Sequence, residues 1–99
     1  MYQIESASSR IKRELRRLPP PDRVRIAEAV QALADDPRPP GVVQLEQDVY
    51  RLGWGDYRVI YKVLDEERII LIGRIVRHST MLMTGRSEST YRDLRRLFE

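Results

Sequence analysis

The sequence predicts an α+β domain, in which an N-terminal α-helical hairpin packs on a small antiparallel β-sheet and a further helix ends the chain. β-branched and aromatic residues are concentrated in residues 50–76, and this composition is typical of strands. Turn-forming residues divide the stretch at positions 53–56 and 65–67, which predicts three antiparallel strands. Because 99 residues provide enough chain for one core only, we expect a single domain over residues 1–99.

Two helices are predicted before the sheet. Residues 2–5 alternate in polarity, so we expect a short strand that joins one side of the sheet. Apolar residues at helical spacing then predict an amphipathic helix over residues 7–18, with a basic outer face. The prolines at positions 19–21 end this helix and suit the first turn of another, which is expected to run to about Asp35. The short link between them predicts an antiparallel helical hairpin on one face of the sheet.

The strands are expected to separate apolar from basic residues. Residues 36–48 are expected to form a stiff loop and a connection into the first central strand, with Leu45 as a buried anchor. Side chains alternate between the two faces of a strand. In residues 57–64 one face is apolar and aromatic, and is expected to face the core: Tyr57, Val59, Tyr61 and Val63. The other face mixes cations with apolar residues and is expected to be partly open: Arg58, Ile60, Lys62 and Leu64.

The last part of the chain is expected to be helical. Ser87 and Thr90 provide residue types that begin helices, and the residues after them carry a short apolar stripe. The stripe consists of Leu94, Leu97 and Phe98.

The composition limits the classes of site that the chain can hold. It has no cysteine, which excludes disulfides and thiolate metal ligands. No apolar run approaches the roughly 18 to 20 residues of a membrane span, and we expect a soluble, cytoplasmic protein. The net charge is +3, and sixteen of the eighteen basic residues are arginines. This bias has two explanations, either the codon usage of the genome or the suitability of the guanidinium group for phosphate contacts.

Few kinds of catalytic site fit this sequence. A single histidine, His78, and scattered carboxylates predict no metal site, and no phosphate-binding loop of the Walker type is present. A serine–histidine–acid triad with His78 has no residue that marks a nucleophile. The remaining feature is a set of arginines on or next to the sheet, with tyrosines between them.

The order of these motifs resembles the RelE/ParE superfamily, the toxins of bacterial toxin–antitoxin systems. The resemblance covers nearly the whole chain, from the helical hairpin with its Leu-Pro-Pro break at positions 18–20 to Thr-Tyr-Arg at 90–92. Its most specific part is Gly-Asp-Tyr-Arg-Val-Ile-Tyr at 55–61. Some members of this superfamily cleave mRNA on the ribosome without a metal, and others act on DNA gyrase. The resemblance implies a cognate antitoxin as partner, in a complex able to bind operator DNA, and no cofactor.

Site residues follow from the resemblance and from the chemistry of RNA cleavage. Without a metal the 2′-hydroxyl is the nucleophile, so the protein must move protons and stabilise negative charge at phosphorus. We expect Arg58 to stabilise this charge, Arg77 and Arg86 to hold flanking phosphates, and Tyr91 to stack on a base or assist proton transfer. The expected catalytic residues are therefore Arg58, Arg77, Arg86 and Tyr91, and the expected RNA-binding residues are Arg51, Lys62 and His78.

Two features depart from the pattern of the superfamily. Gly53 occupies a position where RNA-cleaving members can carry a second basic residue. Residues 78–85 separate Arg77 from Arg86, and we interpret them as an insertion that splits an Arg-Arg pair. An alternative alignment places the terminal tyrosine of the superfamily at Met83 and leaves this chain without that residue.

The expected function is that of a ribosome-dependent mRNA endoribonuclease that inhibits translation and contacts the ribosome and its message. A gyrase inhibitor that acts by binding is the first alternative, and an inactive toxin is the second. Fold alone does not decide among them, because function depends on the site.

Overall fold

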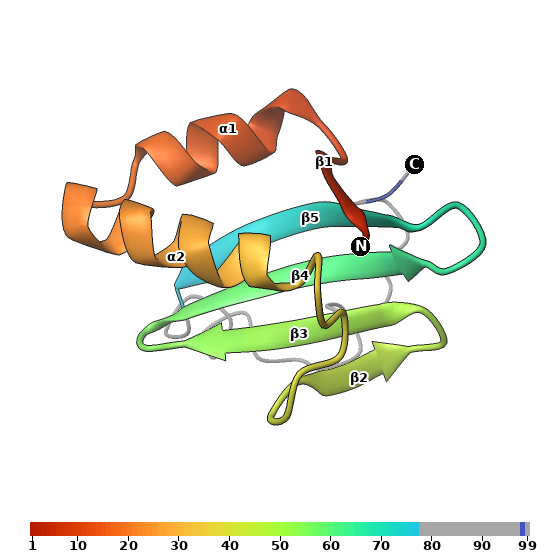
Figure 1. Cartoon of the computed structure of the whole chain (residues 1–99). Helices are drawn as coiled ribbons and strands as arrows, with labels where there is room; N and C mark the ends of the chain where they lie inside the picture. The colour runs from red at the N-terminus through yellow and green to blue at the C-terminus, as the bar shows by residue number, and fades with distance from the viewer. Residues whose placement is uncertain (78–97, 99) are drawn as a thin grey trace.

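The computed structural model describes residues 1–77 and residue 98. In this part of the chain a five-stranded mixed sheet is accompanied by two consecutive helices (Figure 1). The order of strands across the sheet is β1-β5-β4-β3-β2. The elements in chain order are β1 (Gln3–Ser6), α1 (Ser9–Arg16), α2 (Pro20–Ala32), β2 (Val43–Glu46), β3 (Val49–Trp54), β4 (Tyr57–Leu64) and β5 (Ile69–Arg77).

The predicted α+β fold class is confirmed, but the sheet is not wholly antiparallel as we expected. The three central strands pair antiparallel, whereas β1 pairs parallel to β5. The direction of β1 follows from the position of α1, which contacts the sheet mainly at β5. Because α1 begins only a few residues after β1, β1 must run in the direction of β5 to deliver the chain there.

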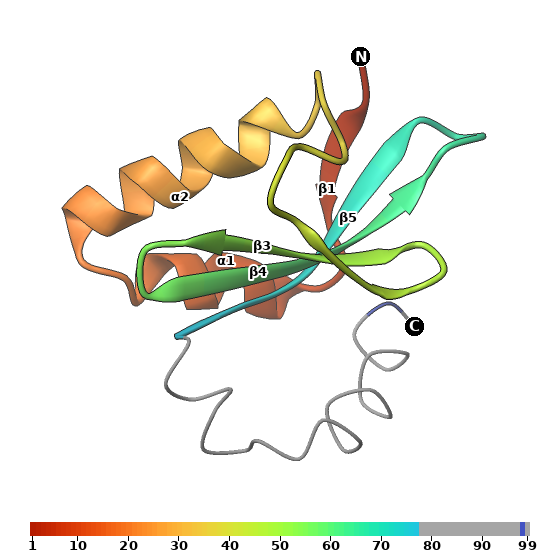
Figure 2. The ribbon, with the colours of Figure 1, turned by 90° about the horizontal axis from the view of Figure 1, so that it is seen from below.

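The two helices have different places on the sheet. α2 lies across one face, and α1 lies along the β5 edge (Figures 1 and 2). An antiparallel hairpin of helices packed against each other is therefore not confirmed. Prolines occupy the first turn of α2, as predicted. None of the helices within the described residues is long and apolar enough to span a membrane.

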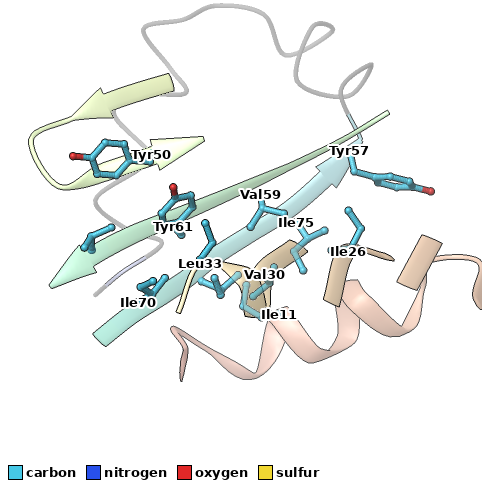
Figure 3. Packing of buried hydrophobic residues seen from close by; sticks show 12 residues of the cluster. Ile11, Ile26, Val30, Leu33, Tyr50, Tyr57, Val59, Tyr61, Ile70 and Ile75 are labelled. Atoms are coloured by element: carbon cyan, nitrogen blue, oxygen red, sulfur yellow. The ribbon is translucent and has the colours of Figure 1, made fainter. Parts of the chain in front are cut away.

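The main core lies between the sheet and the two helices, with α2 and Ile11 of α1 contributing to it (Figure 3). Tyr57, Val59, Tyr61 and Val63 are all buried here, which confirms the predicted core face of β4. A smaller cluster lies on the opposite face, where Val49 and Ile60 are buried and Leu45 and Phe98 pack against them.

The strand β2 was not predicted. It has four residues, and its pairing with β3 is irregular between Gln44 and Glu46. Such an irregularity breaks the alternation on which recognition of a strand depends. The predicted C-terminal helix lies outside the described residues, apart from Phe98.

Candidate nucleic-acid interface

Three cations that form no ion pair with the described residues gather on the face of the sheet that points away from α2, where Arg74 also lies but is paired with Glu14. Arg51 comes from β3, and Arg58 and Lys62 come from β4. Across β3 and β4, Arg51 pairs with Ile60, Gly53 with Arg58 and Val49 with Lys62. Residues paired in this way share a face of the sheet, so the cations alternate with the buried Val49 and Ile60. We call Arg51, Arg58 and Lys62 the cationic face.

The cationic face is not neutralised by carboxylates within residues 1–77 and 98. Both ion pairs in this part of the chain involve other arginines, Arg38 and Arg74. The three cations therefore share one face without an internal carboxylate partner among the described residues. Such an arrangement suits the binding of a polyanion.

Arg58 is held in place by the backbone of the β3–β4 hairpin. Its Nη1 donates to the carbonyl oxygen of Tyr57 at 2.7 Å and to that of Gly55 at 3.0 Å. The guanidinium lies against Gly53, where an added Cβ would be 3.4 Å from Cζ. Arginine has five N–H donors, and both of these bonds use Nη1. The donors on Nε and Nη2 make no hydrogen bond to the described residues, so the fixed guanidinium keeps three donors for an anion.

Arg77 does not join the cationic face. It pairs with Tyr57, and its Cζ lies 5.8 Å from the centroid of the Tyr57 ring. Tyr57 is on the α2 side of the sheet, where its hydroxyl donates to Asp22 at 3.0 Å. Arg58 and Arg77, both expected to be catalytic, therefore lie on opposite sides of the sheet.

An irregularity in β5 explains the position of Arg77. Tyr61 pairs with Ile72 while the preceding Ile60 pairs with Arg74, so Gly73 is an extra residue in β5. One extra residue moves every later side chain of the strand to the opposite face. Without it, Arg77 would lie on the same face as Arg58.

The other predicted site residues fall where the structure gives no description. Arg86, Tyr91 and His78 lie outside the described residues, as does the segment 78–85. Their roles remain predictions. Of the residues expected to act on RNA, the structure places Arg51, Arg58 and Lys62 together and Arg77 apart.

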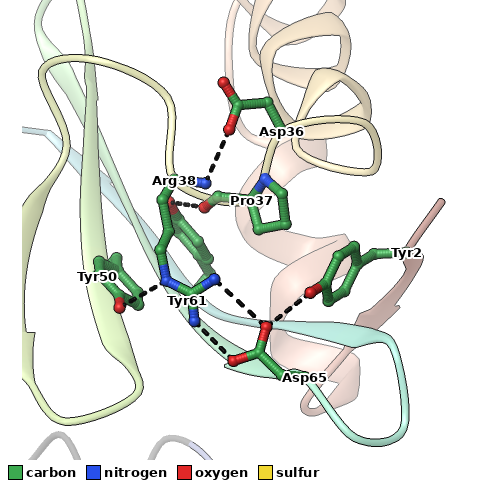
Figure 4. A network of polar contacts seen from close by, with 7 residues as sticks. All are labelled: Tyr2, Asp36, Pro37, Arg38, Tyr50, Tyr61 and Asp65. Carbon is green, nitrogen blue, oxygen red and sulfur yellow. Dashed lines mark hydrogen bonds and ion pairs between the residues drawn. The ribbon is translucent and has the colours of Figure 1, made fainter.

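A second group of polar residues was not predicted and lies on the α2 side of the sheet (Figure 4). Arg38 forms two bonds to the Asp65 carboxylate, at 2.8 and 3.3 Å, and its Nε donates to the Tyr50 hydroxyl at 2.8 Å. The Tyr2 hydroxyl donates to Asp65 at 2.6 Å, and that of Tyr61 donates to the carbonyl oxygen of Pro37 at 2.7 Å. We call Tyr2, Arg38, Tyr50 and Asp65 the Arg38 network.

The contacts of the Arg38 network serve the fold. The hydrogen bonds from Arg38 and Tyr2 hold the pKa of Asp65 below its ordinary value, so the carboxylate stays charged. Burial raises the pKa of Tyr61, which therefore remains a neutral hydroxyl. Because the guanidinium of Arg38 is engaged by Asp65 and Tyr50, this arginine is poorly suited to hold a ligand. No local sequence pattern reveals the network, since its members are distant in the chain.

No metal site is found in the described part of the chain. Residues 1–77 and 98 contain no group of three or more histidine, aspartate or glutamate residues that could hold an ion. The chemistry available on the cationic face is that of permanently charged donors, which bind phosphates and stabilise negative charge.

Comparisons with known proteins agree with this fold. Residues 5–82 match the family described as the ParE toxin of the type II toxin–antitoxin system parDE. The archaeal RelE–RelB complex from Pyrococcus horikoshii OT3 contains a similar chain, with 30% identity and a TM-score of 0.73 over 78% of this chain and 94% of that one. No match was found among curated proteins.

Two further solved structures share the fold. The isolated Escherichia coli RelE toxin has 20% identity and a TM-score of 0.69, with 98% of this chain and 99% of that chain covered. The RelBE2 toxin–antitoxin complex from Mycobacterium tuberculosis has 22% identity and a TM-score of 0.67, with 77% and 96% covered. With the match over residues 5–82, these likenesses establish that the chain is a toxin of a type II toxin–antitoxin system and belongs to the ParE toxin family within the RelE/ParE superfamily.

Proposed function

We propose that this toxin cleaves mRNA on the ribosome without a metal, and that its cationic face holds the RNA backbone. The observation that supports this most is the fixed guanidinium of Arg58, with Arg51 and Lys62 on the same face. Phosphate contacts supply much of the affinity of proteins for nucleic acids. A rigid cation with unused donors also suits a transition state in which charge develops on phosphoryl oxygens.

The reaction divides its tasks among these residues. The 2′-oxygen attacks the adjacent phosphorus while the bond from phosphorus to the 5′-oxygen breaks, which leaves a cyclic phosphate and a free 5′-hydroxyl. Arg58 stabilises the charge on the phosphoryl oxygens, and Arg51 and Lys62 bind flanking phosphates. A base takes the proton of the 2′-hydroxyl, and an acid returns one to the leaving oxygen. Arginine stays protonated, so these two steps fall to Tyr91 and His78, whose roles rest on the resemblance and on intrinsic pKa.

An antitoxin partner forms part of this proposal. The similar archaeal chain is in complex with RelB, and the mycobacterial structure is also a toxin–antitoxin complex. We expect the antitoxin of this chain to cover the cationic face in the cytoplasm and to bind operator DNA as part of the complex.

Two observations favour inhibition of DNA gyrase as the second candidate function. The family that matches residues 5–82 is named for ParE toxins. Gly53 also removes a basic residue from the cationic face, and Arg77 lies on the other side of the sheet. A toxin of this kind would act by binding and would need no proton transfer.

Cell-free translation separates the two functions. We expect the wild-type chain to cut ribosome-bound messages, and Arg58→Ala to lower the cleavage rate by about 10²- to 10³-fold, the usual effect of removing one donor to a developing anion. Tyr91→Phe should also lower the rate if Tyr91 transfers a proton. Arg68→Ala is the control, because Arg68 is an exposed cation in the β4–β5 turn, at the opposite end of β4 from the hairpin tip where the Arg58 guanidinium lies.

Primer extension on the messages and a supercoiling assay with purified gyrase provide the readouts. Ribosome-dependent cuts that disappear in Arg58→Ala and persist in Arg68→Ala would support the proposal. Intact messages together with blocked supercoiling would overturn it in favour of the second candidate.

A further inference from the structure

A cation and an aromatic ring meet at the end of the β3–β4 hairpin, outside the cationic face. The Cζ atom of Arg25 lies 5.8 Å from the centroid of the Trp54 ring. Trp54 is half-buried and packs against the main core, whereas Arg25 is exposed on α2. The start of α2, the β3–β4 turn and the end of β5 lie at the same end of the molecule (Figures 1 and 2). Arg25 therefore covers a ring that the core holds in place.

Arg25 differs from the arginine two residues earlier. The Nη2 of Arg23 donates to the carbonyl oxygens of Arg16 and Leu18, at 3.0 and 3.2 Å, and so closes the end of α1. Arg25 makes no hydrogen bond and no ion pair with residues 1–77 or 98. Its contact within this part of the chain is the cation–π contact with Trp54. A role in holding the fold, like that of Arg23, does not account for Arg25.

The β3–β4 hairpin places the Arg25–Trp54 pair close to the cationic face. Trp54 pairs across the hairpin with Tyr57, and Tyr57 is followed by Arg58 on the opposite face. The Nη1 of Arg58 is bonded to the carbonyl oxygens of Gly55 and Tyr57, so its guanidinium is at the same hairpin end. One guanidinium thus lies on each side of the hairpin tip. A single strand held at Arg58 needs only to pass over residues 55–56 to reach Arg25.

We propose that Arg25 and Trp54 form a stacking site for an unpaired base of the RNA strand, next to the nucleotide held at Arg58. Proteins bind unpaired RNA by stacking its bases on aromatic rings and on guanidinium groups, with cations along the backbone. An acidic peptide would use only the charge of Arg25, whereas a base can also stack on the plane of the guanidinium that covers the indole, so RNA fits the pair better. This inference rests on the proposed function, because it takes RNA as the ligand.

Trp54 provides a direct probe, since it is the only tryptophan in the chain. The full-length protein is titrated at low ionic strength with a short oligoribonucleotide that lacks secondary structure, while tryptophan fluorescence is recorded. We expect saturable quenching in the wild type. In Arg25→Gln the dissociation constant should rise about fivefold or more, as for the loss of one stacked base. Arg68→Gln removes the same charge from the exposed β4–β5 turn, at the opposite end of β4, and should change the dissociation constant much less. Urea unfolding checks that both variants are folded.

Each outcome supports or overturns the inference. RNA binding measured by anisotropy, without a change in Trp54 fluorescence and without an effect of Arg25→Gln, would overturn the stacking site and leave the proposed function intact. Quenching by RNA in a protein that cuts no message would keep the stacking site and overturn RNA cleavage. Absence of RNA binding at low salt, or quenching by an acidic peptide and not by RNA, would overturn the inference.

Discussion

At the scale of single residues, Gly53 decides where the guanidinium of Arg58 lies. In the sequence, Gly53 stands at a position where RNA-cleaving members of the superfamily can carry a basic residue. In the structure the absence of its side chain gives the Arg58 guanidinium room to lie against β3, with all three nearest atoms to an added Cβ belonging to Arg58. Glycine at position 53 therefore lacks a cation of its own but helps to fix the guanidinium of Arg58. Arg25, which sequence analysis did not select, is positioned in a comparable way by Trp54.

A larger side chain at position 53 should lower the rate of the proposed cleavage without lowering the stability of the fold. In Gly53→Val the branched side chain would occupy the place of the Arg58 guanidinium, and we expect the proposed cleavage rate to fall by about tenfold or more. Stability should stay equal or rise, because valine favours strands and Gly53 is exposed. Gly53→Ala is the matched control, since a Cβ at 3.4 Å from Cζ is tolerated with little movement. Cleavage assays and urea unfolding on both variants give the comparison, and equal activity in the two would contradict the role of Gly53.

At the scale of elements, α1 closes an edge of the sheet. β1 pairs with the first half of β5, up to Ile72. Beyond this point the Glu14 carboxylate accepts from the backbone N–H of Ile75 at 3.1 Å and from Nε of Arg74 at 3.3 Å. An open strand edge is prone to pair with other chains. Glu14 thus accepts a backbone hydrogen bond that a neighbouring strand would otherwise accept, and it holds Arg74 in an ion pair.

Loss of Glu14 should weaken the fold at this edge. In Glu14→Ala the N–H of Ile75 loses its acceptor, and we expect the free energy of unfolding to fall by about 1–3 kcal/mol. Glu28→Ala is the control, because Glu28 is exposed on α2 and forms no ion pair with the described residues. Urea denaturation followed by circular dichroism measures both variants. Equal stability of the two would show that α1 does not protect the edge through Glu14.

At the scale of the whole molecule, the two sides of the sheet differ in how their charged residues are paired. On the α2 side the Arg38 network joins the N-terminal residues, the proline-containing loop, β3 and the β4–β5 turn (Figure 4). On the other side the cationic face carries charges without carboxylate partners among residues 1–77 and 98. Asp65 and Glu14 therefore neutralise Arg38 and Arg74, and the cations of the cationic face are left for a ligand.

This division predicts a dependence of stability on pH. The pKa of Asp65 is lower in the folded chain than its ordinary value of 3.8, so the charged carboxylate stabilises the fold at neutral pH. That contribution is complete above about pH 4 and is lost as the pH falls through the folded pKa. Asp65→Asn should therefore be less stable than the wild type at pH 7, and the difference should shrink below pH 4. Glu66→Gln, in the same exposed turn, is the control, and a difference that does not vary with pH would contradict the prediction.

The sequence by itself determined strands β1, β3, β4 and β5, the two helices of the described residues and one pair of site residues, because these depend on local periodicity. Alternation along residues 57–64 was enough to place Arg58 and Lys62 on one face, opposite the buried Tyr57 and Tyr61. The turns and the proline-started second helix also follow from local residue preferences.

Only the tertiary structure decided which distant residues share a face. Arg51 joins Arg58 because of the register of β3 on β4, and the extra residue at Gly73 moves Arg77 to the other side. The parallel direction of β1, the pairing of Arg38 with Asp65 and the contact of Arg25 with Trp54 likewise depend on packing between segments far apart in the chain. The physical reason is that periodicity fixes the face of a side chain within one strand, whereas register, bulges and helix placement are set by the whole core.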